Sequence, residues 1–332
     1  MTETLFLTSD DVSGLATPAD YVDRVADGYR QRGDGAPADP RTALFADDPT
    51  GMLTSYTAIL PEDGYMGGYT YSAGFGAGDA WFMTPLFDAD SGEPLALLDG
   101  ASMNPFKTGA TGAVGVDVLA RENATRVGVI GSGAQARGQL RATATVRELT
   151  AVEVYSPTAA NREAFAEEMT ETLGVDVTAV ESSTAAVADT DIVITATSAS
   201  DPVFDGDQLA PGTHVTAMGQ YNPNKRELDT TTIERSTYVP DLRDRATQDA
   251  GSFLHAIDAG VIDESHIHAE LGDIVADNAV GRTSDEEITV FDSGGTAIET
   301  VAAAGMLYER AREQGLGSMI EFAPASNALT GR

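Results

Sequence analysis

The stretch RVGVIGSGAQARGQL, residues 126–140, decides how the middle of this chain folds. Its apolar run Val127–Ile130 has the length and composition of a buried strand, and a helix-forming segment follows. Between them stands Gly131-Ser132-Gly133-Ala134-Gln135-Ala136, with the spacing G-x-G-x-x-A. Gly131 permits a tight turn, Gly133 lets the backbone approach a pyrophosphate, and Ala136 allows close packing of helix on strand. Because the first N–H groups of that helix would face the phosphates, we predict a dinucleotide-binding turn.

Strands and helices alternate after this turn. Apolar segments at 152–155, 191–197, 214–218 and 288–291 predict strands, with a helix starting after Thr158. Such βα units build a parallel sheet with right-handed crossovers. Before the turn, the sequence predicts a helix capped by Thr17 with Pro18 at its start, a meander of antiparallel strands over 51–99 and a helix over about 104–122. A last long helix is expected over about 296–314.

Composition narrows the possible partners. The 332 residues include 52 Asp and Glu against 20 Lys and Arg, which gives a formal charge of −32. Such a surface repels nucleic acid and anionic lipid, so neither is expected as a partner. Only Lys107 and Lys225 are lysines, and this scarcity together with the acidity resembles proteins of extreme halophiles. At 1 M salt the Debye length is about 3 Å, so surface carboxylates scarcely repel one another.

Several chemistries and locations are also disfavoured. There is no cysteine, which excludes disulfides, thiolate nucleophiles and Cys-ligated metal. His266 and His268 are spaced i, i+2 in a helix-like context where they would not share a face, so no metal site is expected. The N-terminal segment lacks the basic and apolar parts of a signal peptide, and no run of 18 apolar residues occurs. A cytoplasmic protein is expected.

A set of motifs in one order makes the sequence similar to a known family. These motifs are Gly92–Gly100, Lys107–Ala110, the glycine turn, 191–204, Pro223–Asp229, Ala269–Gly272, 281–284, 288–291 and 295–298. They resemble the ornithine cyclodeaminase/mu-crystallin family over about residues 41–315. The resemblance implies an α/β protein with a Rossmann dinucleotide-binding domain over 121–305. It also implies an α+β substrate and dimerisation domain formed by 1–120 with 306–332, and a homodimer.

The resemblance also suggests which residues contact a substrate. The family's carboxylate-binding arginine in an "RTxA" turn corresponds to Lys107, and an N-terminal arginine corresponds to Arg41. The family's strand lysine corresponds to Tyr69. Its catalytic aspartate, two residues before the proline of "PxKxEL", corresponds to Tyr221. A phenol is a poor base at pH 7 but a competent hydrogen-bond donor, so Lys107 and Tyr221 are the catalytic candidates.

Cofactor contacts are expected at the turn and at the ends of the predicted strands. The residues implied are Thr108, Gly131, Ser132, Gly133, Ala134, Gln135, Ala136, Ser156, Thr158, Arg162, Ala196, Thr197, Ser198, Met218, Gly219, Ser293 and Gly294. The second strand ends in Tyr155-Ser156 without the acid that usually binds the ribose hydroxyls of NAD. This favours NADP over NAD, with Arg162 as a candidate phosphate partner.

The reaction stays open at this point. An NAD(P)-dependent oxidoreductase acting on a C–N bond is favoured, either an imine reductase or an amino-acid dehydrogenase, with an amino or imino acid as substrate. One alternative is a cyclodeaminase-type ammonia lyase that recycles its NAD internally. Another is a non-catalytic NAD(P)H-linked binding protein like mu-crystallin. The departures at Tyr69, Lys107 and Tyr221 put ornithine cyclodeamination and alanine oxidation in doubt.

Overall fold

The structure, a computed structural model, describes residues 2–219 and 221–330. The chain forms two compact units. The first combines residues 1–107 with 296–332, and the second comprises 108–295. The sequence predicted unit boundaries after residues 120 and 305. The observed boundaries, after residues 107 and 295, lie earlier in the chain. The glycine turn falls in the second unit in either division.

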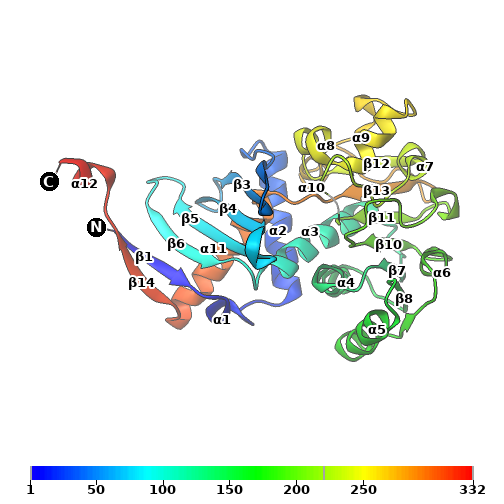
Figure 1. Cartoon of the computed structure of the whole chain (residues 1–332), viewed down its shortest axis with the longest axis horizontal. Helices are drawn as coiled ribbons and strands as arrows, with labels where there is room; N and C mark the ends of the chain where they lie inside the picture. The colour runs from blue at the N-terminus through cyan, green and yellow to red at the C-terminus, as the bar shows by residue number, and fades with distance from the viewer. Residues whose placement is uncertain (1, 220, 331–332) are drawn as a thin grey trace. The chain divides into compact units, whose positions relative to one another are not determined.

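The first unit is built on a seven-stranded sheet. Its strand order is β14 (Ser318–Phe322), β1 (Thr2–Leu7), β6 (Pro94–Asp99), β5 (Asp79–Asp88), β4 (Tyr65–Gly74), β3 (Thr50–Leu60) and β2 (Thr42–Asp47). All neighbours pair antiparallel except β1 and β6, which are parallel. Figure 1 shows β1 and β14 side by side at one edge. The meander predicted over 51–99 is present as β3 to β6, and β1, β2 and β14, which were not predicted, extend the sheet on its two sides.

Two long helices pack on one face of this sheet. α2 (Pro18–Gly33) and α11 (Ala297–Gln314) contact each other, and α11 contacts β3, β4 and β5. Both helices start with a capping box, in which Thr17 pairs with Asp20 and Thr296 pairs with Glu299. The shorter helices of this unit are α1 (Ser9–Val12), the 3₁₀ turn η1 (Phe75–Ala77) and α12 (Ala325–Thr330).

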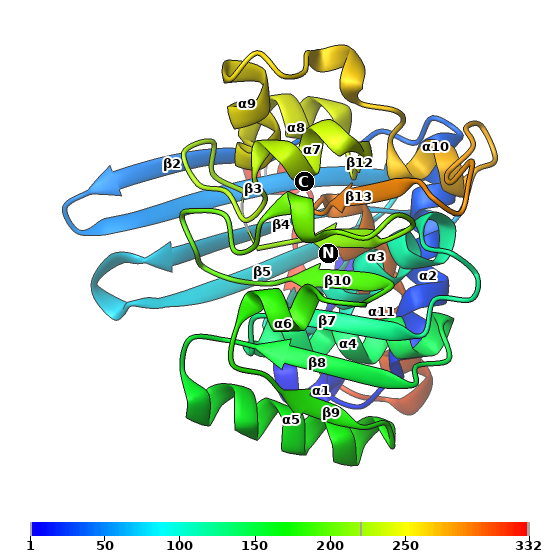
Figure 2. The same ribbon diagram turned by 90° about the vertical axis from the view of Figure 1, so that its right-hand side faces the viewer.

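The second unit is a Rossmann fold. Its sheet order is β12 (Ser236–Pro240), β13 (Ile288–Asp292), β11 (His214–Ala217), β10 (Ile192–Thr195), β7 (Arg126–Ile130), β8 (Ala151–Tyr155) and β9 (Val177–Ala179). Every neighbouring pair is parallel. Figure 2 shows β9, β8, β7 and β10 in succession. The strand order reverses between β7 and β10, where such sheets bind ligands.

Helices cover the parallel sheet, and buried apolar side chains form its core. They are α3 (Asn104–Leu119, beginning in the first unit), α4 (Ala134–Val146), α5 (Ala159–Leu173), α6 (Ser183–Val187), α7 (Thr230–Arg235), α8 (Arg243–Asp249), α9 (Gly251–Asp258) and α10 (Leu271–Val275), with 3₁₀ turns η2 (Gly206–Gln208) and η3 (Glu264–His266). Glycine lets α3 and α4 cross closely, because a Cβ on Gly109 would lie 2.3 Å from the carbonyl oxygen of Gly138.

The fold class expected from the sequence, an α/β chain with a Rossmann domain and an α+β domain, is confirmed. The predicted strands after the turn correspond to β8, β10, β11 and β13, each within two residues. β9 and β12 were not predicted, and both are short strands at the edges of the sheet. Among the described residues, none of the helices has the length and apolar character needed to cross a membrane.

Candidate functional site

The glycine turn adopts the geometry that its sequence predicts. Gly131 has φ +120°, and a Cβ there would lie 2.2 Å from the carbonyl oxygen of Ala196, so only glycine fits. Gly133 is the N-cap of α4, and the space where its Cβ would stand is open. Ala136 is fully buried beneath the turn. The N-terminus of α4 therefore presents free backbone N–H groups at an accessible position, as a pyrophosphate requires.

A cavity of about 620 Å³ lies beside this turn at the carboxyl ends of β7, β8 and β10. It is lined by Ile130, Gly131, Ser132, Gly133, Tyr155, Ser156, Pro157, Thr158, Asn161, Ser183, Ala196, Thr197, Ser198, Ala199 and Val203. The structure thus gathers eight of the residues implied as cofactor contacts around one cavity. Ala134, Gln135 and Ala136 continue from it into α4, and Thr108 adjoins α4 because its carbonyl accepts a hydrogen bond from the Gln139 amide at 2.9 Å.

The part of this cavity beyond β8 is lined by hydroxyl groups. None of its lining residues in the described part of the chain carries a carboxylate. The Ser132 hydroxyl donates to the Ser156 hydroxyl at 2.9 Å. Arg162 is buried behind the loop, donating to the Ser156 carbonyl at 3.1 Å and pairing with Glu181 at 2.7 Å. Glu181 is 90% exposed, so this ion pair is solvated on its acidic side. The guanidinium supports the loop in this arrangement, and the exposed Glu181 is its only charged partner recorded in the described chain.

One buried carboxylate orders the ends of β10 and β11. Glu227 accepts hydrogen bonds from the Thr195 hydroxyl at 2.9 Å and from the backbone N–H groups of Thr197 and Gly219, each at 2.7 Å. Burial raises the pKa of Glu227, and these donors act in the opposite direction. A Cβ on Gly219 would lie 2.3 Å from Glu227 Oε1, so the strand end can approach the carboxylate only as glycine.

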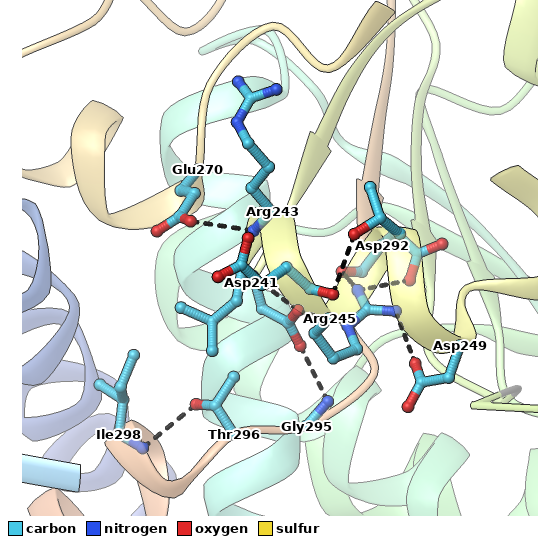
Figure 3. A network of polar contacts seen from close by, with 12 residues as sticks. Asp241, Arg243, Arg245, Asp249, Glu270, Asp292, Gly295, Thr296 and Ile298 are labelled. Carbon is cyan, nitrogen blue, oxygen red and sulfur yellow. Dashed lines mark hydrogen bonds and ion pairs between the residues drawn. The ribbon is translucent and has the colours of Figure 1, made fainter. Parts of the chain in front are cut away.

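A second buried network orders the end of β13. Arg245 is fully buried and pairs with Asp241 at 2.7 Å, Asp292 at 2.8 Å and Asp249 at 3.5 Å, as Figure 3 shows. The Tyr238 hydroxyl donates to Asp292 at 2.8 Å. This network fixes the backbone from Asp292 onward, which carries the next two predicted cofactor contacts.

Those two contacts, Ser293 and Gly294, adjoin the strand ends directly. The Ser293 N–H donates to the Ala217 carbonyl at 2.8 Å, and a Cβ on Gly294 would lie 2.6 Å from Arg245 Nε. Met218 is buried at the end of β11, where its N–H donates to the Thr195 carbonyl at 3.1 Å. Tyr221, a predicted catalytic residue, lies in the following loop and is 40% exposed.

In the first unit, Lys107 is buried on the sheet face covered by α2 and α11. Its Nζ lies 4.8 Å from the centroid of the Tyr69 ring and 3.5 Å from Glu299 Oε1. Tyr69 in turn stacks on Phe82 with ring centroids 5.3 Å apart. Burial lowers the pKa of Lys107, Glu299 raises it, and Arg41 lowers it further. The structure therefore brings together three residues that the sequence placed far apart.

Arg41 lies at the same place. It is 4% exposed, and its guanidinium carbon is 5.7 Å from the centroid of the Tyr56 ring. The Tyr69 hydroxyl is buried and has no hydrogen-bond partner within the described part of the chain. Burial raises the pKa of Tyr69, so its hydroxyl stays protonated and available as a donor. Two cations and one donor hydroxyl on a single sheet face suit a small molecule that carries a carboxylate.

The sequence model of the ornithine cyclodeaminase/mu-crystallin family matches residues 2–315. This chain belongs to that family. The resemblance inferred from the motifs is thereby confirmed.

Three members of the family are closely similar. The Δ1-pyrroline-2-carboxylate reductase of Bacillus cereus is 39% identical over 238 residues, which cover 71% of this chain and 73% of that protein. The structure of Thermococcus litoralis Δ1-pyrroline-2-carboxylate reductase with NADH and L-proline has a TM-score of 0.91 at 33% identity and covers 96% of this chain and 100% of that one. An archaeal alanine dehydrogenase dimer with bound NAD has a TM-score of 0.91 at 31% identity, covering 97% and 100%.

Three buried charged residues, two in the second unit and one in the first, were not predicted from the sequence. Glu227 stands inside the Pro223–Asp229 motif, so its position was visible although its role was not. Glu299 follows the cap Thr296 by three residues, a spacing that identifies a capping box but not a partner for Lys107. Asp241 and Asp249 lie four residues before and after Arg245, a spacing that is common on exposed helix faces, and nothing local marks its distant partner Asp292 or the burial of the group.

Replacing Arg245 with methionine should destabilise the protein by about 3–5 kcal/mol, because the remaining aspartates would be buried without a cation. Arg243→Met, on the same helix but exposed, is the matched control and should change stability by less than about 0.5 kcal/mol. Denaturant unfolding measures both. Equal stability of the two variants would contradict the role given to the network.

Proposed function

We propose that this family member is an NAD(P)-dependent oxidoreductase acting on a carbon–nitrogen bond, and that its substrate is a cyclic 2-imino acid of the Δ1-pyrroline-2-carboxylate type. The observation that carries this proposal is the buried group of Arg41, Lys107 and Tyr69. The similar reductase of Bacillus cereus, whose name gives that substrate, supports it.

The charges in the first unit suit one substrate carboxylate. Arg41 and Lys107 are buried cations, and Glu299 supplies one anion beside them. Two cations on one buried sheet face attract an anion, and a monocarboxylate supplies one. Because buried charges are costly unless paired, the substrate's carboxylate group would gain more here than a neutral ligand. A cyclic imino acid has such a group beside the carbon that is reduced.

Lys107 and Tyr221, which stand where the family resemblance implies an arginine and an aspartate, favour one direction of the proposed reaction. Reducing an imine adds a hydride to carbon and a proton to nitrogen, so the site needs a proton donor. The nicotinamide supplies the hydride when it is bound. Lys107 has a lowered pKa and, unlike an arginine in its place, can release a proton. Amino-acid oxidation instead requires a base, and the phenol of Tyr221 is a poor one. Tyr221 stays a candidate hydrogen-bond donor.

For the cofactor, we propose NADP ahead of NAD. The cavity next to β8 is lined by the hydroxyls of Ser156 and Thr158 and lacks a carboxylate among its recorded lining residues, so a 2′-phosphate would meet no repulsion there. Arg162 is one turn into α5 and would add a positive potential, although Glu181 pairs with it. The similar structures contain NADH or NAD, which lack the 2′-phosphate, so the proposal of NADP rests on the residues of this chain alone.

We further propose that the first unit forms a homodimer through the sheet face turned away from α2 and α11. Strand register places Leu44 beside Leu53, and Ser72 beside both Leu53 and Trp81. These three apolar side chains are 66%, 45% and 67% exposed, and Met83, which shares their face, is 59% exposed. A cluster of this kind on a sheet face marks an association surface. The similar alanine dehydrogenase is a dimer.

The acidic composition suits a cytoplasmic enzyme of a cell whose interior is rich in salt. With a formal charge of −32, the folded chain repels itself at low ionic strength, and this repulsion is screened at molar salt. The two lysines stand at family motifs, Lys107 in the buried group and Lys225 in the segment that leads to Glu227. Both lysines of the chain therefore lie within motif segments.

Oxidation of NADPH and NADH should be followed at roughly 2 M salt with Δ1-pyrroline-2-carboxylate, its six-membered homologue, and pyruvate with ammonia. We expect the five-membered imine to give the highest kcat/KM, with NADPH preferred. Lys107→Arg should keep KM within a few fold and lower kcat by about 10²–10⁴, because a guanidinium does not release a proton. Lys107→Met should also raise KM. Tight cofactor binding without turnover would favour a binding protein, and ammonia release from ornithine would favour a lyase.

Introducing a charge on the exposed sheet face should prevent dimer formation. We expect Met83→Glu to yield a monomer in light scattering coupled to gel filtration, because a buried unpaired carboxylate opposes association. Val280→Glu, at a position 64% exposed in the second unit, is the control and should stay dimeric. Trp81 is the only tryptophan, so its fluorescence should shift to the red in the monomer. A dimer that survives Met83→Glu would contradict this interface.

Lowering the salt from roughly 2 M to roughly 0.1 M should lower the Tm measured by circular dichroism, because the Debye length grows to about 10 Å and surface carboxylates then repel one another. Glycerol at low salt serves as a control, since it does not screen charge. A Tm that is unchanged by salt would exclude adaptation to a saline interior.

A further inference from the structure

Glu299 is held rigidly beside Lys107 by groups from two helices. Its Oε1 accepts the Thr296 N–H at 2.9 Å, and its Oε2 accepts the hydroxyls of Thr296 and, at 3.3 Å, Tyr29. The side chain is fully buried. Lys107 Nζ is 3.5 Å from Oε1, so the carboxylate faces the ammonium while its other contacts come from the helix cap and from α2. A capping box needs only an acceptor at this position, and an exposed helix start would serve as well.

We propose that Glu299 is a positioning residue for the reaction, which holds the Lys107 ammonium against the Tyr69 ring and keeps it charged in a buried site. This inference rests on the proposed function for its consequence in catalysis, but the contact itself does not depend on the substrate. Glu299 thus has two tasks in one conformation, since the oxygen that accepts from the cap also faces Lys107.

The groups around Lys107 explain why a carboxylate is needed there. Arg41 adds a second positive charge, and the rings of Tyr69 and Tyr56 occupy the sheet side. Burial and Arg41 both favour the neutral amine, whereas Glu299 alone among these groups carries a negative charge. The Tyr69 ring face attracts a cation but carries no net charge. Without Glu299, the balance at Lys107 would move toward the uncharged form, which neither binds a carboxylate nor donates a proton.

The Glu299→Gln variant tests the charge of residue 299 separately from its role in capping α11. Glutamine also completes a capping box, so α11 should still start at the same residue and the variant should fold. Glu299→Asp keeps the charge on a shorter side chain and is the conservative variant. Glu313→Gln removes an exposed carboxylate from the same helix and is the matched control.

The direct measurement uses the scarcity of lysine. With lysine labelled by ¹³C and ¹⁵N, the full-length protein should give NMR signals from only Lys107 and Lys225, and Lys225 serves as the internal reference. We expect Glu299→Gln to lower the titration midpoint of Lys107 by about one pH unit or more, and Glu299→Asp to lower it less. Glu313→Gln should leave both signals unchanged.

In the reductase assay, the loss of kcat/KM at high pH should shift to lower pH by the same amount in Glu299→Gln. Lys107 must be protonated to act, and the removed carboxylate had favoured its protonated form. An unchanged Lys107 titration in a folded Glu299→Gln protein would overturn the proposal. If no imine is reduced by the unaltered protein, the proposed function fails while the NMR titration still decides the role of Glu299.

Discussion

The hydrogen bonds accepted by the buried carboxylate of Glu227 fix the edge of the parallel sheet on which the second unit depends. Where a parallel strand ends, the backbone N–H and C=O groups that follow are no longer paired by the sheet. A buried backbone group costs free energy unless it is hydrogen-bonded. Glu227 satisfies N–H groups beyond β10 and β11 together. The strand ends can therefore carry loops that stay in place beside the cofactor cavity.

Buried charged side chains hold backbone segments in place elsewhere in the chain as well. Arg245 and its aspartates set the backbone after β13, and Glu299 joins the start of α11 to Lys107. In each case a buried charge has at least one partner from a segment distant in sequence. Arg245 contacts three aspartates and Lys107 faces Glu299, so these two buried cations each hold carboxylates in place.

The chemistry inferred for the protein follows from which of these charges can move a proton. A guanidinium binds a carboxylate firmly but keeps its proton, whereas a buried ammonium with a lowered pKa can do both. We propose on this ground, with Lys107 as the proton donor and a phenol in place of the aspartate that the family resemblance implies, that the protein protonates an imine and does not deprotonate an amine. Two of the three departures that left the reaction open in the sequence, Lys107 and Tyr221, support this proposed direction, and the position of Lys107 beside Glu299 adds to that support.

The sequence by itself determined the elements whose signals are local. The glycine turn, the apolar strands after it, the cap at Thr17 and the meander before it all depend on neighbours within a few residues, so their positions could be predicted closely. The motifs, taken in order, also determined the family. Only the tertiary structure decided that Arg245 meets Asp292, that Glu299 meets Lys107, and that Glu227 joins two strand ends. The physical reason is that a buried charge is stabilised by whichever partners the fold brings within a few ångströms, and their separation along the chain leaves no periodic pattern to detect.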